Sequence, residues 1–144
     1  MTDNPENPMF RSRNPAVIAP PIGKYAHLVE PPPGHRLVFV AGQVGISPSG
    51  MLPADAGEQT RLVFANLGLL LGELGVGPER VVKMLTFVVG TGNLTAWSIA
   101  RDAVYTEWYP HGHYPAHALA VVAGLARADL LVETEAIVAV PVDA

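Results

Sequence analysis

The stretch VVKMLTFVV, residues 81–89, decides the fold class. It is apolar except for Lys83 and Thr86 and is rich in β-branched residues, which is typical of a strand. A strand with one face in water alternates apolar and polar residues, whereas this one is apolar almost throughout. We therefore expect a buried strand in a sheet that is covered on both faces.

A helix is predicted on each side of this strand. Before it, Asp55 can cap a helix together with Glu58, and Gly75 can end that helix in a left-handed conformation. After it, Asn93 is a good N-cap, and the second helix should end before Pro110. The apolar stripe of the second helix comprises Trp97, Ala100, Val104 and Trp108.

Further strands are predicted toward both ends of the chain. Three lie before the first helix, at residues 16–19, 25–29 and 36–41, and two close the chain, at residues 117–123 and 130–140. This order predicts an α+β fold with a split βαβ unit and two helices on one face of a mixed sheet. Self-association is the simplest way to cover the other face.

Composition indicates one domain. The chain has 144 residues, 49% of them hydrophobic and 15% charged, which suits a single core. Residues 1–14 are polar and rich in Pro and Asn, so we expect a flexible tail followed by one domain at residues 15–144. The tail lacks the apolar segment of a secretory signal, and we expect a cytoplasmic protein without a membrane partner.

Charge and cysteine content exclude several kinds of site. The formal net charge is −4 and the Lys and Arg residues are scattered, so no nucleic-acid partner is expected. The chain contains no cysteine, which rules out disulfides, thiolate metal sites and Cys nucleophiles.

Two carboxylates stand close together in the stretch LVETEAI, residues 131–137. Alternate residues of a strand share a face, so Glu133 and Glu135 should point the same way. Mutual repulsion and an apolar setting would favour a bound proton, which suits general acid–base chemistry. An exposed edge strand whose charges deter aggregation would carry the same pattern.

Histidines gather late in the chain, at positions 111, 113 and 117. A His-Gly-His loop can bind a metal, but this spacing matches no strong zinc signature, and we expect neither a metal nor a cofactor. Tyr25 follows a turn that could present its hydroxyl to a cleft, although a core tyrosine is an equally good interpretation.

Short motifs in a fixed order point to a family. They are PIGKY at 21–25, VAGQ at 40–43, EQT at 58–60 with NL at 66–67, VVK at 81–83, YP at 109–110, PA at 115–116 and VETEAI at 132–137. From residue 14 to residue 140 the chain resembles the Rid/YjgF family of reactive intermediate deaminases, also known as L-PSP endoribonucleases. Several short motifs in order are far more specific than any one of them.

The resemblance implies a fold and an activity. Members have a chorismate-mutase-like fold, related to the ferredoxin-like split βαβ arrangement, and form homotrimers with a ligand cleft between subunits. The best-known branch hydrolyses small enamine or imine intermediates to a keto acid and ammonia, without a metal or cofactor.

The resemblance also assigns roles to individual positions. Tyr25 corresponds to the tyrosine that lines the cleft, Gly42 to the residue whose carbonyl helps to hold the attacking water, and Glu133 to the acidic residue that handles protons. His117, Leu119 and Glu135 are assigned to substrate binding.

The chain departs from the family at one of these positions. The family motif Pro-Ala-Arg is Pro115-Ala116-His117 here. The family arginine clamps the substrate carboxylate with two parallel hydrogen bonds, and a histidine cannot make that fork. We therefore expect weak binding of small 2-imino acids.

Three functions follow from these observations. The first is a hydrolase that deaminates an enamine or imine whose acid group is absent or held differently. The second is a non-catalytic trimer that binds a small metabolite or a partner protein. The third is a ribonuclease, which the acidic charge and scattered basic residues disfavour.

Overall fold

Strand β4 (Val81–Val89) lies inside a four-stranded sheet with the strand order β3-β6-β4-β5. The computed structural model describes residues 10–143. The other strands of this sheet are β3 (His35–Val44), β5 (Ala116–Val122) and β6 (Val132–Pro141). Strand β6 runs antiparallel to β3 and β4, whereas β4 and β5 are parallel, so the sheet is mixed.

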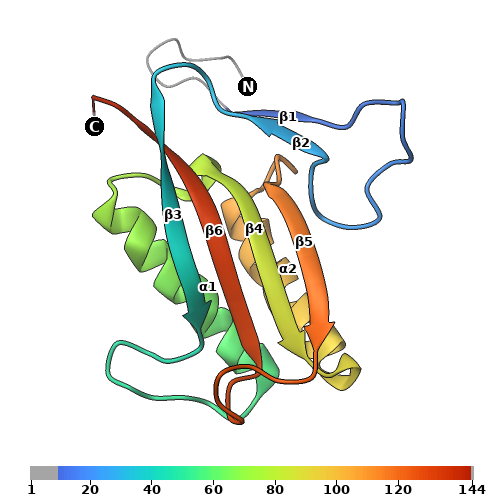
Figure 1. Cartoon of the computed structure of the whole chain (residues 1–144), viewed down its shortest axis with the longest axis vertical. Helices are drawn as coiled ribbons and strands as arrows, with labels where there is room; N and C mark the ends of the chain where they lie inside the picture. Colours follow the sequence, from blue (N-terminus) through green and yellow to red (C-terminus); the bar gives the residue numbers. More distant parts are fainter. Residues whose placement is uncertain (1–9, 144) are drawn as a thin grey trace.

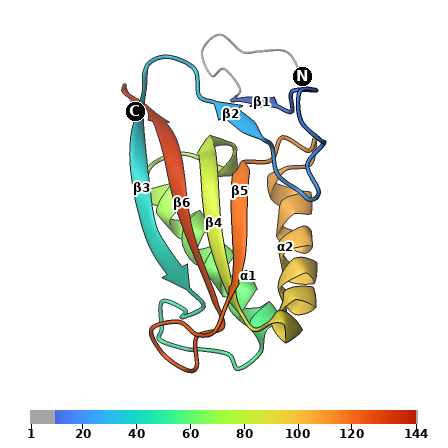
Figure 2. The ribbon, with the colours of Figure 1, turned by 45° about the vertical axis from the view of Figure 1, so that its right-hand side comes forward.

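Both long helices lie on the same face of this sheet (Figures 1 and 2). Helix α1 (Ala56–Glu73) connects β3 to β4, and α2 (Leu94–Trp108) connects β4 to β5. Because β6 lies between β3 and β4 and opposes both, β3–α1–β4 is a split βαβ unit. The predicted α+β class, with two helices on one face of a mixed sheet, is confirmed.

The predicted helix ends are partly correct. The Asp55 side chain accepts a hydrogen bond from the Glu58 backbone N–H at 3.1 Å, and Gly75 has a left-handed φ of 70° just after α1. Asn93, in contrast, makes no capping bond with its side chain. The 3₁₀ turn η2 (Thr91–Asn93) precedes α2, and Asn93 Nδ2 donates instead to the carbonyl of Val89 at 2.7 Å.

The N-terminal strands differ from the prediction. Strands β1 (Arg11–Arg13) and β2 (Leu28–Glu30) form a separate two-stranded antiparallel sheet. Residues 16–19 contain no strand, and the extended segment expected at 25–29 begins only at Leu28. Part of the expected tail is ordered in β1, while its first nine residues lie outside the described part. The sequence Arg-Ser-Arg has no apolar residue to reveal a strand.

The core fills the space between the sheet and the two helices. A short 3₁₀ turn, η1 (Pro78–Arg80), directly precedes β4. Alternate residues of β6 are buried on this side, and α1 contributes its apolar stripe. The buried core residues include Val63, Phe64, Leu67, Leu71, Met84, Val88, Val132, Ala136 and Val138.

The opposite face of the sheet carries no helix and exposes several apolar side chains. We call it the open face; on β3 it includes Leu37 and Phe39, which are 53% and 72% exposed. Leu85 and Phe87 of β4 lie on the same face and are half-buried. The described residues thus leave uncovered a face that the sequence predicted to be covered. No helix within residues 10–143 is long and apolar enough to cross a membrane.

Candidate functional site

Gly42 and Glu133 lie against each other where β3 bulges. Val40 pairs with Ala136, but Gln43 pairs with Thr134, so β3 holds one extra residue at this point. A β-carbon built on Gly42 would lie 2.8 Å from the carboxyl carbon of Glu133 and 2.9 Å from its Oε1. Only glycine leaves room for the carboxylate here.

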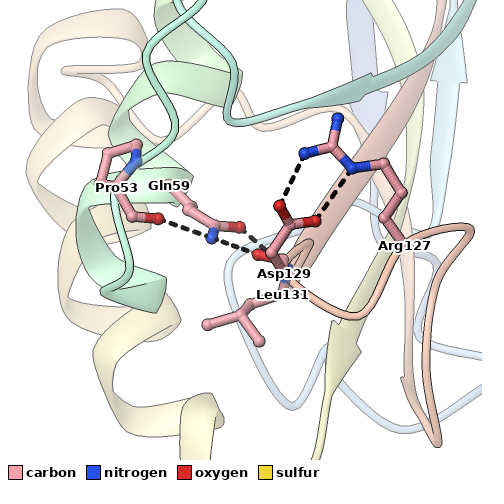
Figure 3. Close-up of polar contacts among 5 residues, drawn as sticks. All are labelled: Pro53, Gln59, Arg127, Asp129 and Leu131. Atoms are coloured by element: carbon pink, nitrogen blue, oxygen red, sulfur yellow. Dashed lines mark hydrogen bonds and ion pairs between the residues drawn. The ribbon is translucent and has the colours of Figure 1, made fainter.

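A buried glutamine on α1 fixes the start of β6, just before Glu133 (Figure 3). Gln59 is fully buried. Its Nε2 donates to the carbonyls of Pro53 at 2.8 Å and Asp129 at 2.9 Å, and its Oε1 accepts from the Leu131 N–H at 2.9 Å. One side chain therefore joins the loop before α1 to the loop before β6. Arg127 closes that second loop with two hydrogen bonds to the Asp129 carboxylate, at 3.0 and 2.6 Å.

The end of β3 is held by the same helix. Asn66 Nδ2 donates to the carbonyl of Val44 at 3.2 Å and to that of Ile46 at 2.8 Å. A β-carbon on Gly45 would come within 2.7 Å of the Gln59 α-carbon, so strand and helix backbones meet here. The motif residues Gln59 and Asn66 thus position the two strand ends that carry Glu133 and Gly42.

Glu133 and Glu135 share the open face, as the alternation predicted. In the ladder between β4 and β6 they stand opposite Phe87 and Leu85, respectively. Glu133 is half-buried and Glu135 is exposed. Because β6 is flanked on both sides by other strands, the alternative of an exposed edge strand is wrong.

His117 lies on the other side of the sheet. It pairs with Met84, whose side chain is buried beneath the helices. His117 Nε2 is 2.9 Å from Thr86 Oγ1, and the ring stacks on Trp97 at a centroid distance of 6.0 Å. Burial, with a further contribution from the charge of Arg101, lowers the pKa of His117 to about 4. The imidazole is therefore neutral at physiological pH.

Leu119 lies on the same strand as His117, and the loop that carries Tyr25 is hydrogen-bonded to the residue before that strand. Leu119 is two residues further along β5, so it shares the helix side and is partly exposed at the sheet edge. Next to Tyr25, the Ala26 N–H donates to the carbonyl of Pro115 at 3.2 Å, just before β5. The Tyr25 hydroxyl accepts a hydrogen bond from the Ile22 N–H at 3.2 Å.

The predicted site residues thus form two groups within one chain. Gly42, Glu133 and Glu135 make the carboxylate group on the open face. Tyr25, His117 and Leu119 make the His117 group at the β5 edge. Among the described residues no hydrogen bond or ion pair joins the two groups.

Sequence reasoning missed Arg101. It is buried between Trp97 and Tyr105, with its guanidinium carbon 4.7 and 5.3 Å from the ring centroids. Spacings of four residues along α2 place all three side chains on one stripe. That spacing was the only available signal.

A separate apolar pocket of about 250 Å³ lies beneath β1 and β2. His111 and His113 line it with Phe10, Val81 and Trp108. Val81 begins β4, whereas Glu133 stands opposite Phe87 near the end of that strand. The histidine loop is therefore distant from the carboxylate group along the sheet.

The Endoribonuclease L-PSP family model matches residues 17–140, nearly the whole described chain. The chain belongs to the Rid/YjgF family. A RutC family protein from Synechocystis sp. is 30% identical over 84% of this chain and 89% of its own length. The putative reactive intermediate deaminase TdcF of Escherichia coli is 28% identical over 70% of this chain and 77% of its own length.

Solved structures of the Rid/YjgF family share the fold. A conserved Rid family protein of unknown function, YyfB from Yersinia pestis, has a TM-score of 0.77 at 30% identity and covers 90% of this chain and 97% of its own. Escherichia coli TdcF with bound serine has a TM-score of 0.65 at 28% identity, covering 82% and 89%. These neighbours have the same two helices on a mixed sheet.

Proposed function

We propose that this Rid/YjgF family member hydrolyses a reactive enamine or imine to a carbonyl compound and ammonia. The observation that carries the proposal is the packing of the Glu133 carboxylate against Gly42 at the β3 bulge. Membership of the family, and the relative named as a putative reactive intermediate deaminase, support the same chemistry.

The carboxylate group is suited to adding water across a C=N bond. Glu133 takes a proton from the attacking water as the oxygen bonds to the imine carbon, while the Gly42 carbonyl holds that water. Glu133 then gives that proton to nitrogen, which forms a carbinolamine. It next moves the proton of the new hydroxyl to the same nitrogen, so that the C–N bond breaks and ammonia leaves as the carbonyl forms. Water and the imine are the only reactants, so no oxidant or cofactor is needed.

The cleft of this reaction lies between subunits in our proposal. Glu133 and His117 project from opposite faces of one sheet, so a pocket lined by both requires two chains. Exposed apolar residues such as Leu37 and Phe39 favour association of the open face with another chain. We propose a homotrimer in which neighbouring chains cover this face.

A coupled assay tests the reaction directly. An amino-acid oxidase would generate an imine, semicarbazide would trap what remains, and Glu133→Gln should lower turnover about a hundred-fold or more, as expected for loss of a general acid–base group. Glu107→Gln is the control, because its exposed carboxylate lies on α2, outside the carboxylate group. Equal turnover by wild type and Glu133→Gln would refute the proposal.

A non-catalytic binding protein is the second candidate. It is favoured by His117, which replaces the family arginine and whose Nε2 is already bonded to Thr86. Saturable binding of a 2-oxo acid, with no turnover of any imine tested, would support it over the hydrolase.

A further inference from the structure

Arg101 is held in one position between α2 and β5. Its side chain is only 11% exposed. Its guanidinium lies over Trp97, on which His117 of β5 also stacks. Stacking on aromatic rings restricts a long side chain that would otherwise lose much rotamer freedom on binding a ligand.

Two cations share one carboxylate at this point. Asp102 Oδ1 lies 2.8 Å from Arg101 Nε and 3.3 Å from Lys24 Nζ. Burial raises the pKa of Asp102, but the bonds from Arg101 and Lys24 outweigh it and lower the pKa below its ordinary value. Asp102 is thus ionised, and no other ion pair within residues 10–143 involves these three side chains. The cluster Lys24–Arg101–Asp102 carries one excess positive charge.

Donors also outnumber acceptors in this cluster. Nε is the only nitrogen of Arg101 that has a hydrogen-bond partner in the described chain. The only buried side-chain nitrogen or oxygen without a partner there is Trp97 Nε1, so the terminal nitrogens of Arg101 reach solvent. Two unpaired guanidinium nitrogens that reach solvent are suited to an acceptor with two oxygens.

The cluster lies beside the position of the family arginine. The Ala26–Pro115 hydrogen bond ties the loop that carries Lys24 and Tyr25 to the start of β5. The Arg101 charge acts on His117, which occupies the arginine position. The guanidinium of Arg101 therefore lies near position 117, where the family has its arginine, but it comes from helix α2 and not from β5.

We propose that Arg101 and Lys24 form a binding site for the carboxylate of a small 2-oxo or 2-imino acid. This rests on the proposed function and assigns the residues that hold the acid group of its substrate: they lie on α2 and in the loop before β2, although β5 carries a histidine. It replaces the expectation, drawn from His117 alone, that such acids are held weakly.

Calorimetric titration of the full chain with 2-oxobutyrate tests the site without requiring turnover. Arg101→Met should weaken binding about ten- to a hundred-fold, the usual effect of losing a charged hydrogen-bonding partner. Asp102→Asn should strengthen binding several-fold, because it removes the competing carboxylate and keeps an acceptor for Arg101 Nε. Arg61→Ala is the control: it removes a cation from an exposed position on α1 and should change nothing.

Arg101→Met is expected to weaken binding and Asp102→Asn to strengthen it, so misfolding cannot produce both results. If Arg101→Met does not fold, tighter binding by Asp102→Asn still supports the site, because a damaged structure would bind more weakly. Absence of 2-oxobutyrate binding by wild type, or equal affinity in a folded Arg101→Met and in wild type, would overturn it. Intact binding with no imine turnover would refute the proposed hydrolysis and leave the site standing.

Discussion

The Glu133 carboxyl group packs against the α-carbon of Gly42, so closely that a β-carbon there would approach within 2.8 Å. Gly42 has no left-handed φ, so an alanine would add a steric conflict without backbone strain. The contact therefore sets where the carboxylate points.

Gly42→Ala should move Glu133 and lower imine turnover at least about tenfold, because small displacements of a catalytic group are costly. The free energy of unfolding should fall by no more than about 2 kcal/mol, since a half-buried side chain can rotate away. Steady-state assays and urea denaturation would measure the two effects. Gly124→Ala is the control, because its β-carbon would meet nothing within 4 Å; similar losses in both variants would contradict the prediction.

Gln59→Met should lower the free energy of unfolding by about 2–4 kcal/mol. The substitution keeps the volume but leaves the Leu131 N–H and two carbonyls without their partner. Urea denaturation would measure the change, and Arg61→Ala, exposed on the same helix, should stay within about 0.5 kcal/mol of wild type. A stable Gln59→Met protein would show that water replaces the lost bonds.

The neutral state of His117 predicts a dependence of stability on pH. Its pKa is about 4 in the folded chain against an ordinary 6.5, so between these values the unfolded chain binds a proton that the folded chain does not. Stability is thus present above the ordinary pKa and is lost as the pH falls toward the lowered one. The loss should reach about 3 kcal/mol near pH 4.

His117→Gln should remove this contribution, since glutamine does not titrate. Denaturant unfolding from about pH 7 to about pH 4 should show wild type losing more stability than the variant. His113→Gln, at an exposed loop position, should follow wild type. Parallel curves for wild type and His117→Gln would mean that His117 is protonated without cost.

Phe39→Asp should dissociate the proposed homotrimer. Phe39 is 72% exposed on the open face, and a carboxylate buried there in each subunit would face an apolar partner. Light scattering should then give a monomer mass, whereas Ile99→Asp, 64% exposed on α2, should keep the assembly. A wild-type mass of one chain at micromolar concentration would remove the trimer from the proposal.

The sequence predicted what depends on local pattern. Apolar continuity placed β4 inside the sheet, and alternation placed Glu133 and Glu135 on one face. The sequence could not predict on which face of the sheet His117 lies. Both faces of β5 consist mostly of apolar or small residues, so only the register of β5 with β4 decides this. Arg101 gave only its spacing of four residues from Trp97 and Tyr105 on α2, which does not by itself predict the burial of a charged side chain.

A guanidinium moved from α2 to β5 should still hold the substrate carboxylate. If Arg101 holds the substrate carboxylate, Arg101→Met should lower turnover of a small 2-imino acid about ten- to a hundred-fold. Adding His117→Arg should restore much of it, because the new fork then stands at the family position and no longer meets the like charge of Arg101. The semicarbazide-coupled assay would measure all four combinations.

The single His117→Arg variant is the informative comparison. Burial lowers the pKa of His117, and the charge of Arg101 lowers it further, so with Arg101 present a second guanidinium would join a like charge. We therefore expect this variant to gain little turnover and to lose stability, whereas the double variant gains over Arg101→Met alone. Equal gains in both backgrounds would mean that the two positions act independently, and that Arg101 does not hold the group that the family arginine holds.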